Sequence, residues 1–147
     1  MAHVSDLMTK TDIQFVNPDT SVREAAEDMK RLHRGCLVVI SKGMLVGILT
    51  ERDLVQKVLA VGKNPEETLV SKIMSEPVIT VKPETSLSDA AKIMVRNKIR
   101  RLPVMEGSKV VGMLTASDFA KYMRLQNRDD PMWAAASRAA GYQTIFE

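Results

Sequence analysis

The sequence predicts a mixed α/β (α+β) fold, in which two β-α-β-β-α repeats pack with pseudo-two-fold symmetry and a C-terminal helical tail follows. Two observations predict this class. The first is an internal repeat, in which the same residue types recur in the same order. The second is a change of apolar periodicity within each repeat, from helical spacing to short β-rich runs. A single unit of this size would bury one face of its sheet poorly, and two units sharing a core solve that problem.

The repeat is visible in blocks that match almost residue for residue. Residues 46–50 (VGILT) recur as residues 111–115 (VGMLT), and residues 18–22 (PDTSV) recur as residues 83–87 (PETSL). So many ordered matches do not arise by chance, and we infer a duplicated structural unit.

The repeat sets the expected domain boundaries. We expect repeat 1 over residues 1–62, a polar linker over 63–69, repeat 2 over 70–126 and the tail over 127–147. The tail is Ala-rich and helix-prone after Pro131, and Trp133 is among its apolar residues. It packs either on its own domain or on a second subunit.

Each repeat has the same order of elements. Short strands flank a helix whose N-cap is Thr20 or Ser21 in repeat 1 and Thr85 or Ser86 in repeat 2. A second helix then starts at the threonine that ends the last strand. We expect strands over residues 13–16, 37–40, 45–49, 78–81, 102–105 and 110–114.

The composition is that of an ordinary globular protein, with 147 residues, 45% hydrophobic and 27% charged. The net charge of +3 mildly favours anionic ligands such as phosphates, but scarce aromatics (4%) argue against nucleic-acid binding. The single cysteine excludes an intrachain disulfide framework. No signal peptide or apolar run of membrane-spanning length is visible, so we expect a soluble, cytoplasmic protein without membrane contact.

The sequence holds no pattern typical of an enzyme. His3 and His33 are isolated, and no cluster of His, Cys and carboxylates has metal-ligand spacing. Neither a Walker loop nor a Gly-x-Ser-x-Gly elbow is present. We therefore expect no catalytic residue, no metal and no catalytic cofactor.

The two strand-to-helix junctions carry the candidate chemistry, at residues 47–53 (GILTERD) and 112–118 (GMLTASD). Each glycine permits close approach of another element or a ligand. Each threonine stands at a helix start, where hydroxyl and free N–H groups can meet an anion. Asp53 and Asp118 follow one turn later, where a carboxylate can accept from the two hydroxyls of a ribose. The alternative is a plain helix N-cap with an acidic first turn.

Arg100 and Arg101 precede the apolar strand of repeat 2, and their planar side chains suit phosphate. Solvated surface charge is the alternative interpretation. Repeat 1 has Gly35 and Cys36 at these positions. The two sites are therefore chemically unequal, and the one in repeat 2 should hold phosphate more tightly.

These residues resemble the CBS-domain family, named after cystathionine β-synthase. The resemblance covers roughly residues 4–59 and 70–125, and residues 97–104 (NKIRRLPV) followed by 112–118 carry it most clearly. Repeat 1 departs from the pattern at residues 35–38 (GCLV), which lack the basic residue and the proline. In similar proteins two such domains form a compact pair, the Bateman module, whose clefts bind AMP, ADP, ATP or related adenosyl ligands.

The resemblance implies a role for each part of the two junctions. Asp118 and Asp53 would hold ribose, the threonines and the residues after them would approach phosphate, and backbone of the partner repeat's first strand would grip adenine. For the site of repeat 2 the implied residues are Met113, Leu114, Thr115, Ala116, Ser117, Asp118, Arg100, Arg101, Asp12, Ile13 and Gln14. For the site of repeat 1 they are Thr50, Glu51, Arg52, Asp53, Pro77, Val78 and Ile79.

We therefore expect a sensor that binds AMP, ADP or ATP in the cleft between the repeats. It would signal to a separate, unidentified protein by a ligand-dependent conformational change. A ligand-free dimerisation scaffold and a nucleic-acid-binding protein are the alternatives. The resemblance also implies a homodimer formed through helices, for which Met29, Met94 and Met123 are candidate mating residues.

Overall fold

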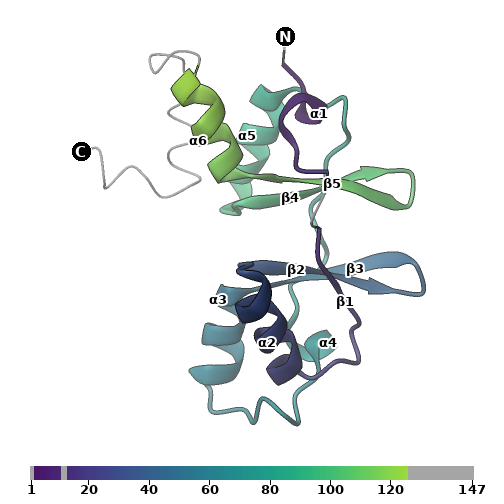
Figure 1. Cartoon of the computed structure of the whole chain (residues 1–147), viewed down its shortest axis with the longest axis vertical. Coiled ribbons are helices and arrows are strands. Elements are labelled where there is room, and N and C mark those ends of the chain that lie inside the picture. Colours follow the sequence, from purple (N-terminus) through teal and green to yellow (C-terminus); the bar gives the residue numbers. More distant parts are fainter. Residues whose placement is uncertain (1, 11–12, 126–147) are drawn as a thin grey trace. The chain divides into compact units, whose positions relative to one another are not determined.

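The computed structural model describes residues 2–10 and 13–125 (Figure 1). The chain divides into two compact units, which we call unit 1 (Met1–Thr11 with Ile79–Glu147) and unit 2 (Asp12–Val78). These units do not follow the sequence repeats, because each repeat contributes its first helix to the core of the other. The predicted tail lies outside the described residues.

Unit 2 is a three-stranded sheet with helices packed on it. The short strand β1 runs parallel to β2, and β2 runs antiparallel to β3. The first helix of repeat 2, α4, belongs to this unit. The elements are β1 (Phe15–Val16), α2 (Val22–Leu32), β2 (Cys36–Ser41), β3 (Met44–Thr50), α3 (Glu51–Leu54), its π-helical continuation η1 (Val55–Leu59) and α4 (Val70–Ile73).

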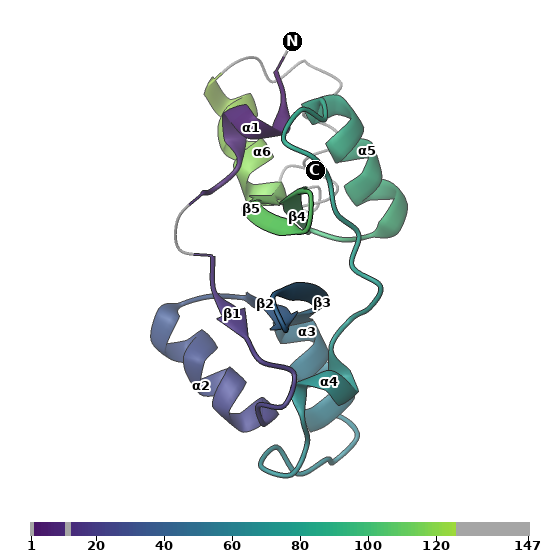
Figure 2. The ribbon, with the colours of Figure 1, turned by 90° about the vertical axis from the view of Figure 1, so that its right-hand side faces the viewer.

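Unit 1 is built in the same way around an antiparallel pair of strands. The expected strand over 78–81 is reduced to a single parallel bridge from Val81 to Val104. The first helix of the chain, α1, packs against α6 in this unit (Figure 2). The elements are α1 (Val4–Leu7), α5 (Leu87–Asn97), β4 (Arg101–Glu106), β5 (Lys109–Thr115) and α6 (Ala116–Leu125).

Of the two residues expected as the N-cap in each repeat, a threonine and a serine, the serine caps the helix. Ser21 Oγ accepts from the backbone N–H of Glu24 at 3.1 Å, and Ser86 Oγ accepts from the backbone N–H of Asp89 at 3.1 Å. Each bond satisfies one of the N–H groups that a helix start leaves free. His33 ends α2 in the left-handed conformation, so its position is a C-cap.

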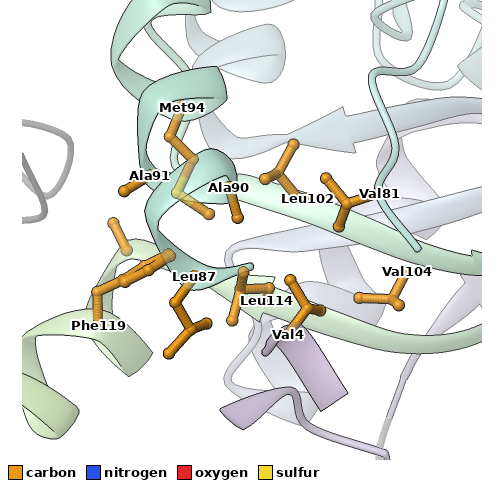
Figure 3. Close-up of a cluster of buried hydrophobic side chains, with 11 residues drawn as sticks. Val4, Val81, Leu87, Ala90, Ala91, Met94, Leu102, Val104, Leu114 and Phe119 are labelled. Carbon is orange, nitrogen blue, oxygen red and sulfur yellow. The ribbon is translucent and has the colours of Figure 1, made fainter. Parts of the chain in front are cut away.

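The exchanged helices supply core residues. In unit 1, Val4 of α1 is fully buried among Leu87, Leu102, Leu114 and Phe119 (Figure 3). In unit 2, α4 contributes Val70 and Ile73 to the corresponding cluster. Neither repeat therefore completes its core from its own residues.

Three methionines were candidates for a mating surface, and the structure buries all of them. Met29 and Met94 belong to the cores of units 2 and 1, and Met123 on α6 is buried as well. The reason is their position on the inward faces of amphipathic helices. They fill the interior and are not available to a second subunit. Over residues 2–10 and 13–125, no helix is long and apolar enough to cross a membrane.

Candidate functional site

The end of β5 and the start of α6 hold Thr115 and Asp118 together. The backbone N–H of Thr115 donates to Asp118 Oδ2 at 2.9 Å, and the backbone N–H of Asp118 donates back to Thr115 Oγ1 at 3.2 Å. This reciprocal capping box fixes both side chains at the first turn of the helix. Asp118 is half-buried, and within the described part of the chain its Oδ1 receives no hydrogen bond. One carboxylate oxygen is therefore available to a ligand.

A cation lies beside this pair. Arg101, the first residue of β4, is directly opposite Thr115 in the β4–β5 ladder, so the two side chains share one face. No ion pair involves Arg101 among residues 2–10 and 13–125. Arg100 is exposed, and its carbonyl accepts from the backbone N–H of Ala116 at 2.8 Å. Of the two predicted arginines, Arg101 is the one next to Thr115.

The glycine of the junction makes room for a segment of repeat 1. Thr9 exchanges two backbone hydrogen bonds with Met113, both 2.9 Å long. A Cβ on Gly112 would lie 2.6 Å from Met8 Sδ and 3.2 Å from the Thr9 carbonyl oxygen. The sequence left open whether an element or a ligand comes close here, and the structure shows that an element does.

The matching junction of unit 2 has the same capping box. Thr50 donates to Asp53 Oδ2 from its backbone N–H at 3.0 Å and from its hydroxyl at 3.1 Å. The backbone N–H of Asp53 donates to Thr50 Oγ1 at 3.2 Å. Cys36 stands opposite Thr50, at the place that Arg101 takes in unit 1.

Two further side chains reach Asp53. The hydroxyl of Ser75 donates to Asp53 Oδ1 at 2.9 Å, and Nζ of Lys57 lies 2.9 Å from the same oxygen. Lys57 also donates to the carbonyl oxygen of Ile73 at 3.0 Å. Asp53 is 4% exposed and is the one charged residue buried to this degree in the described part of the chain. Its carboxylate is engaged on both oxygens.

Sequence reasoning missed Ser75 and Lys57. A comparison of the two repeats shows that both positions differ between the copies. Thr9 stands in repeat 1 where Ser75 stands in repeat 2, and Tyr122 stands in repeat 2 where Lys57 stands in repeat 1. Lys57 also follows Asp53 by one helical turn, a spacing typical of ion pairs. Nothing in the sequence, however, indicates that Ser75 approaches a residue of the preceding repeat.

The other predicted residues divide between exposed and buried positions. Glu51, Arg52 and Ser117 are exposed at the two helix starts. Leu114 and Ala116 point into the core of unit 1, so any ligand contact from them must come from the backbone.

The residues expected to contact adenine lie in both units. For the site of repeat 2, Ile13 and Gln14 belong to unit 2. Asp12, the third residue expected at that site, lies outside the described residues. For the site of repeat 1, Pro77 and Val78 belong to unit 2 and Ile79 belongs to unit 1.

Comparison with known proteins identifies the family. The family model described as the CBS domain matches residues 4–60 and 70–125. CBS domain-containing protein YhcV of Bacillus subtilis is 37% identical over 120 residues, which are 82% of this chain and 84% of YhcV. An uncharacterized conserved protein of Pyrococcus horikoshii superposes with a TM-score of 0.78 at 33% identity, over 84% of this chain and 92% of the other.

CBSX2, whose crystal structure was solved in complex with AMP, superposes with a TM-score of 0.72 at 29% identity. The match covers 85% of this chain and 98% of CBSX2. The family model matches twice, once in each of the two repeats. The chain therefore belongs to the CBS-domain family and carries two copies of the domain in tandem.

Proposed function

We propose that this chain is a regulatory module, not an enzyme, and that the β5–α6 junction of unit 1 holds the ribose and phosphate of an adenine nucleotide. The observation that carries the proposal is the unbonded Oδ1 of Asp118, fixed by the capping box beside Thr115 and Arg101. No other junction in the described residues combines a free carboxylate oxygen with an adjacent unpaired arginine.

The chemistry of the three residues fits the parts of a nucleotide. A ribose presents two neighbouring hydroxyls, and Asp118 Oδ1 can accept a hydrogen bond from them. The guanidinium of Arg101 can donate two parallel bonds to a phosphate. The start of α6 adds N–H groups that favour an anion, with Ser117 exposed at its first turn.

Regulation then requires a ligand-dependent equilibrium. A nucleotide that binds one conformation better shifts the population toward it, and a separate polypeptide reads the change. The CBSX2 structure supports the ligand class, because that relative was solved with AMP. AMP, ADP and ATP all present the same ribose to Asp118, so the phosphate chain is where they differ.

Isothermal titration calorimetry with AMP, ADP and ATP tests this proposal. We expect saturable binding to the wild-type chain and at least a roughly tenfold loss of affinity in Asp118→Asn, which keeps the shape of the side chain. The matched control is Asp89→Asn, an exposed carboxylate at the same helix position in the same unit. An absence of heat at millimolar nucleotide, with folded protein, would refute the proposed function.

Assembly of this chain with itself is a second candidate function, and a surface of unit 2 favours it. Apolar residues of α2, α3 and η1 line an open groove whose exposed members include Val55 (54% exposed) and Leu59 (77% exposed). At the matching place in unit 1, Ala120 is buried. Exposed apolar surface of this kind marks interaction sites.

A further inference from the structure

We infer that the ribose-binding position of unit 2 is closed by two side chains of the protein itself, Ser75 and Lys57, so that the chain binds one nucleotide and not two. This inference rests on the proposed function, because it assigns the same ribose chemistry to the two junctions. We call the contacts of Ser75 and Lys57 with Asp53 the Asp53 lock.

The lock occupies the oxygen that is free in the other copy. In both junctions the capping box uses Oδ2 of the aspartate. In unit 1, Oδ1 of Asp118 has no partner among the described residues, whereas in unit 2 Oδ1 of Asp53 receives the Ser75 hydroxyl and the Lys57 ammonium, each at 2.9 Å. A hydroxyl and a cation therefore already stand where a ribose would donate.

The acceptor capacity of Asp53 is used up. An ionised carboxylate offers about four lone-pair positions. Asp53 fills them with the backbone N–H and the hydroxyl of Thr50, the hydroxyl of Ser75 and the ammonium of Lys57. A ribose must displace at least one of these donors. The exchange gains little, because each new bond replaces an existing one and Asp53 is almost completely buried.

Both parts of the lock are held in place by backbone contacts. Ser75 exchanges two backbone hydrogen bonds with Ile48 of β3, at 2.9 and 3.1 Å. Lys57 is anchored a second time by the Ile73 carbonyl oxygen at the end of α4. The ligand must therefore compete with groups that are already ordered, and ordering them costs no further entropy.

The repeat shows which substitutions would open the lock. Tyr122 stands in unit 1 where Lys57 stands in unit 2, so the residue four positions after Asp118 is not a cation, and no ion pair to Asp118 is present among the described residues. Thr9, which matches Ser75, is exposed and makes no side-chain bond to Asp118 in the described structure. Lys57→Tyr gives unit 2 the residue that unit 1 has at the matching position. Ser75→Ala removes the hydroxyl that donates to Asp53 Oδ1.

The experiment counts AMP equivalents by calorimetry in a series of variants of the full chain. Wild type should bind one equivalent, and Asp118→Asn should bind none at the same concentrations. Adding Lys57→Tyr and Ser75→Ala to Asp118→Asn should restore one equivalent at unit 2. Adding Asp53→Asn to that triple variant should abolish the regained binding.

Two results would overturn the inference. The first is two equivalents in the wild type, with one of them lost in Asp53→Asn. The second is a folded triple variant that binds no AMP. If the wild type binds no nucleotide, the proposed function fails. One equivalent of AMP bound by the triple variant would then still show that Ser75 and Lys57 close the position in unit 2.

Folding is checked by circular dichroism and size-exclusion chromatography, because opening the lock leaves a buried carboxylate with fewer partners. If the triple variant does not fold, Ser75→Ala alone in the Asp118→Asn background retains the ion pair. This variant should then bind one equivalent of AMP with low affinity. Its absence in that folded variant counts against the lock.

Discussion

Arg101 and Thr115 lie directly opposite each other at the start of the β4–β5 ladder, whereas Cys36 and Thr50 form the matching pair in β2–β3. The duplicated fold therefore places an arginine beside one helix start and a thiol beside the other. Under the proposed function, a phosphate would gain a charge-assisted bond at the first junction only. We therefore expect the two junctions to bind a nucleotide unequally, because of these positions and the proposed Asp53 lock.

Replacing Arg101 should weaken the binding of nucleotides and leave that of the nucleoside unchanged. We expect Arg101→Met to lower the affinity for AMP roughly tenfold or more, because a hydrogen bond to a charged group contributes about 1.5–3 kcal/mol. Adenosine lacks the phosphate, so calorimetry with adenosine should show the same affinity for both proteins. The control is Arg96→Met, at an exposed position in the last turn of α5. Equal losses for AMP and adenosine would show that Arg101 does not contact phosphate.

Adding one methyl group at Gly112 should destabilise unit 1. The new Cβ would meet Met8 Sδ at 2.6 Å and the Thr9 carbonyl oxygen at 3.2 Å, and overpacking of this kind costs about 1–3 kcal/mol. Urea unfolding of Gly112→Ala measures the loss. The same substitution in a Met8→Ala background should cost less, because the nearer contact is gone. An equal cost in both backgrounds would place the strain elsewhere.

Removing the Lys57 ammonium should lower the free energy of unfolding. We expect Lys57→Met to cost roughly 1–3 kcal/mol, because it leaves Asp53 buried without its ion-pair partner. The side chain of Lys57 is 44% exposed, so the loss should be smaller than for a fully buried pair. In Asp53→Asn the same lysine substitution should cost much less, and the double-mutant cycle isolates the pair. Lys63→Met, at an exposed position, serves as the control for loss of a lysine.

The repeat, the strand pairs and the capped helices could be predicted from local sequence. Ser21 and Ser86 begin helices because the capping hydrogen bond spans three residues, and VGILT and VGMLT end strands that pair with their immediate neighbours. The exchange of α1 and α4 could not be predicted in this way. It depends on long-range packing, in which Val4 completes a core whose other members lie far along the chain.

The candidate site shows the same division. Thr115 and Asp118 are three residues apart, so sequence spacing already brings them together. The sequence narrows the cation beside Thr115 to Arg100 or Arg101, and the register of the β4–β5 hairpin selects Arg101. The bond from Ser75 to Asp53 joins residues of different repeats, and no local pattern indicates it. Long-range contacts of this kind make one copy of a duplicated site differ from the other.

The apolar groove of unit 2 gives the last prediction, which concerns assembly. Leu59 is 77% exposed on η1, and its matching residue in repeat 2 is the charged Arg124. If the groove seats a second copy, Leu59→Lys places an ammonium against apolar surface and should shift the chain from dimer to monomer, as measured by light scattering after size-exclusion chromatography. Met44→Lys is the matched control, because Met44 is equally apolar, 61% exposed, and lies in the same unit but outside the groove. A wild-type chain that is monomeric at high micromolar concentration would contradict the proposed assembly, and so would a dimer unaffected by Leu59→Lys.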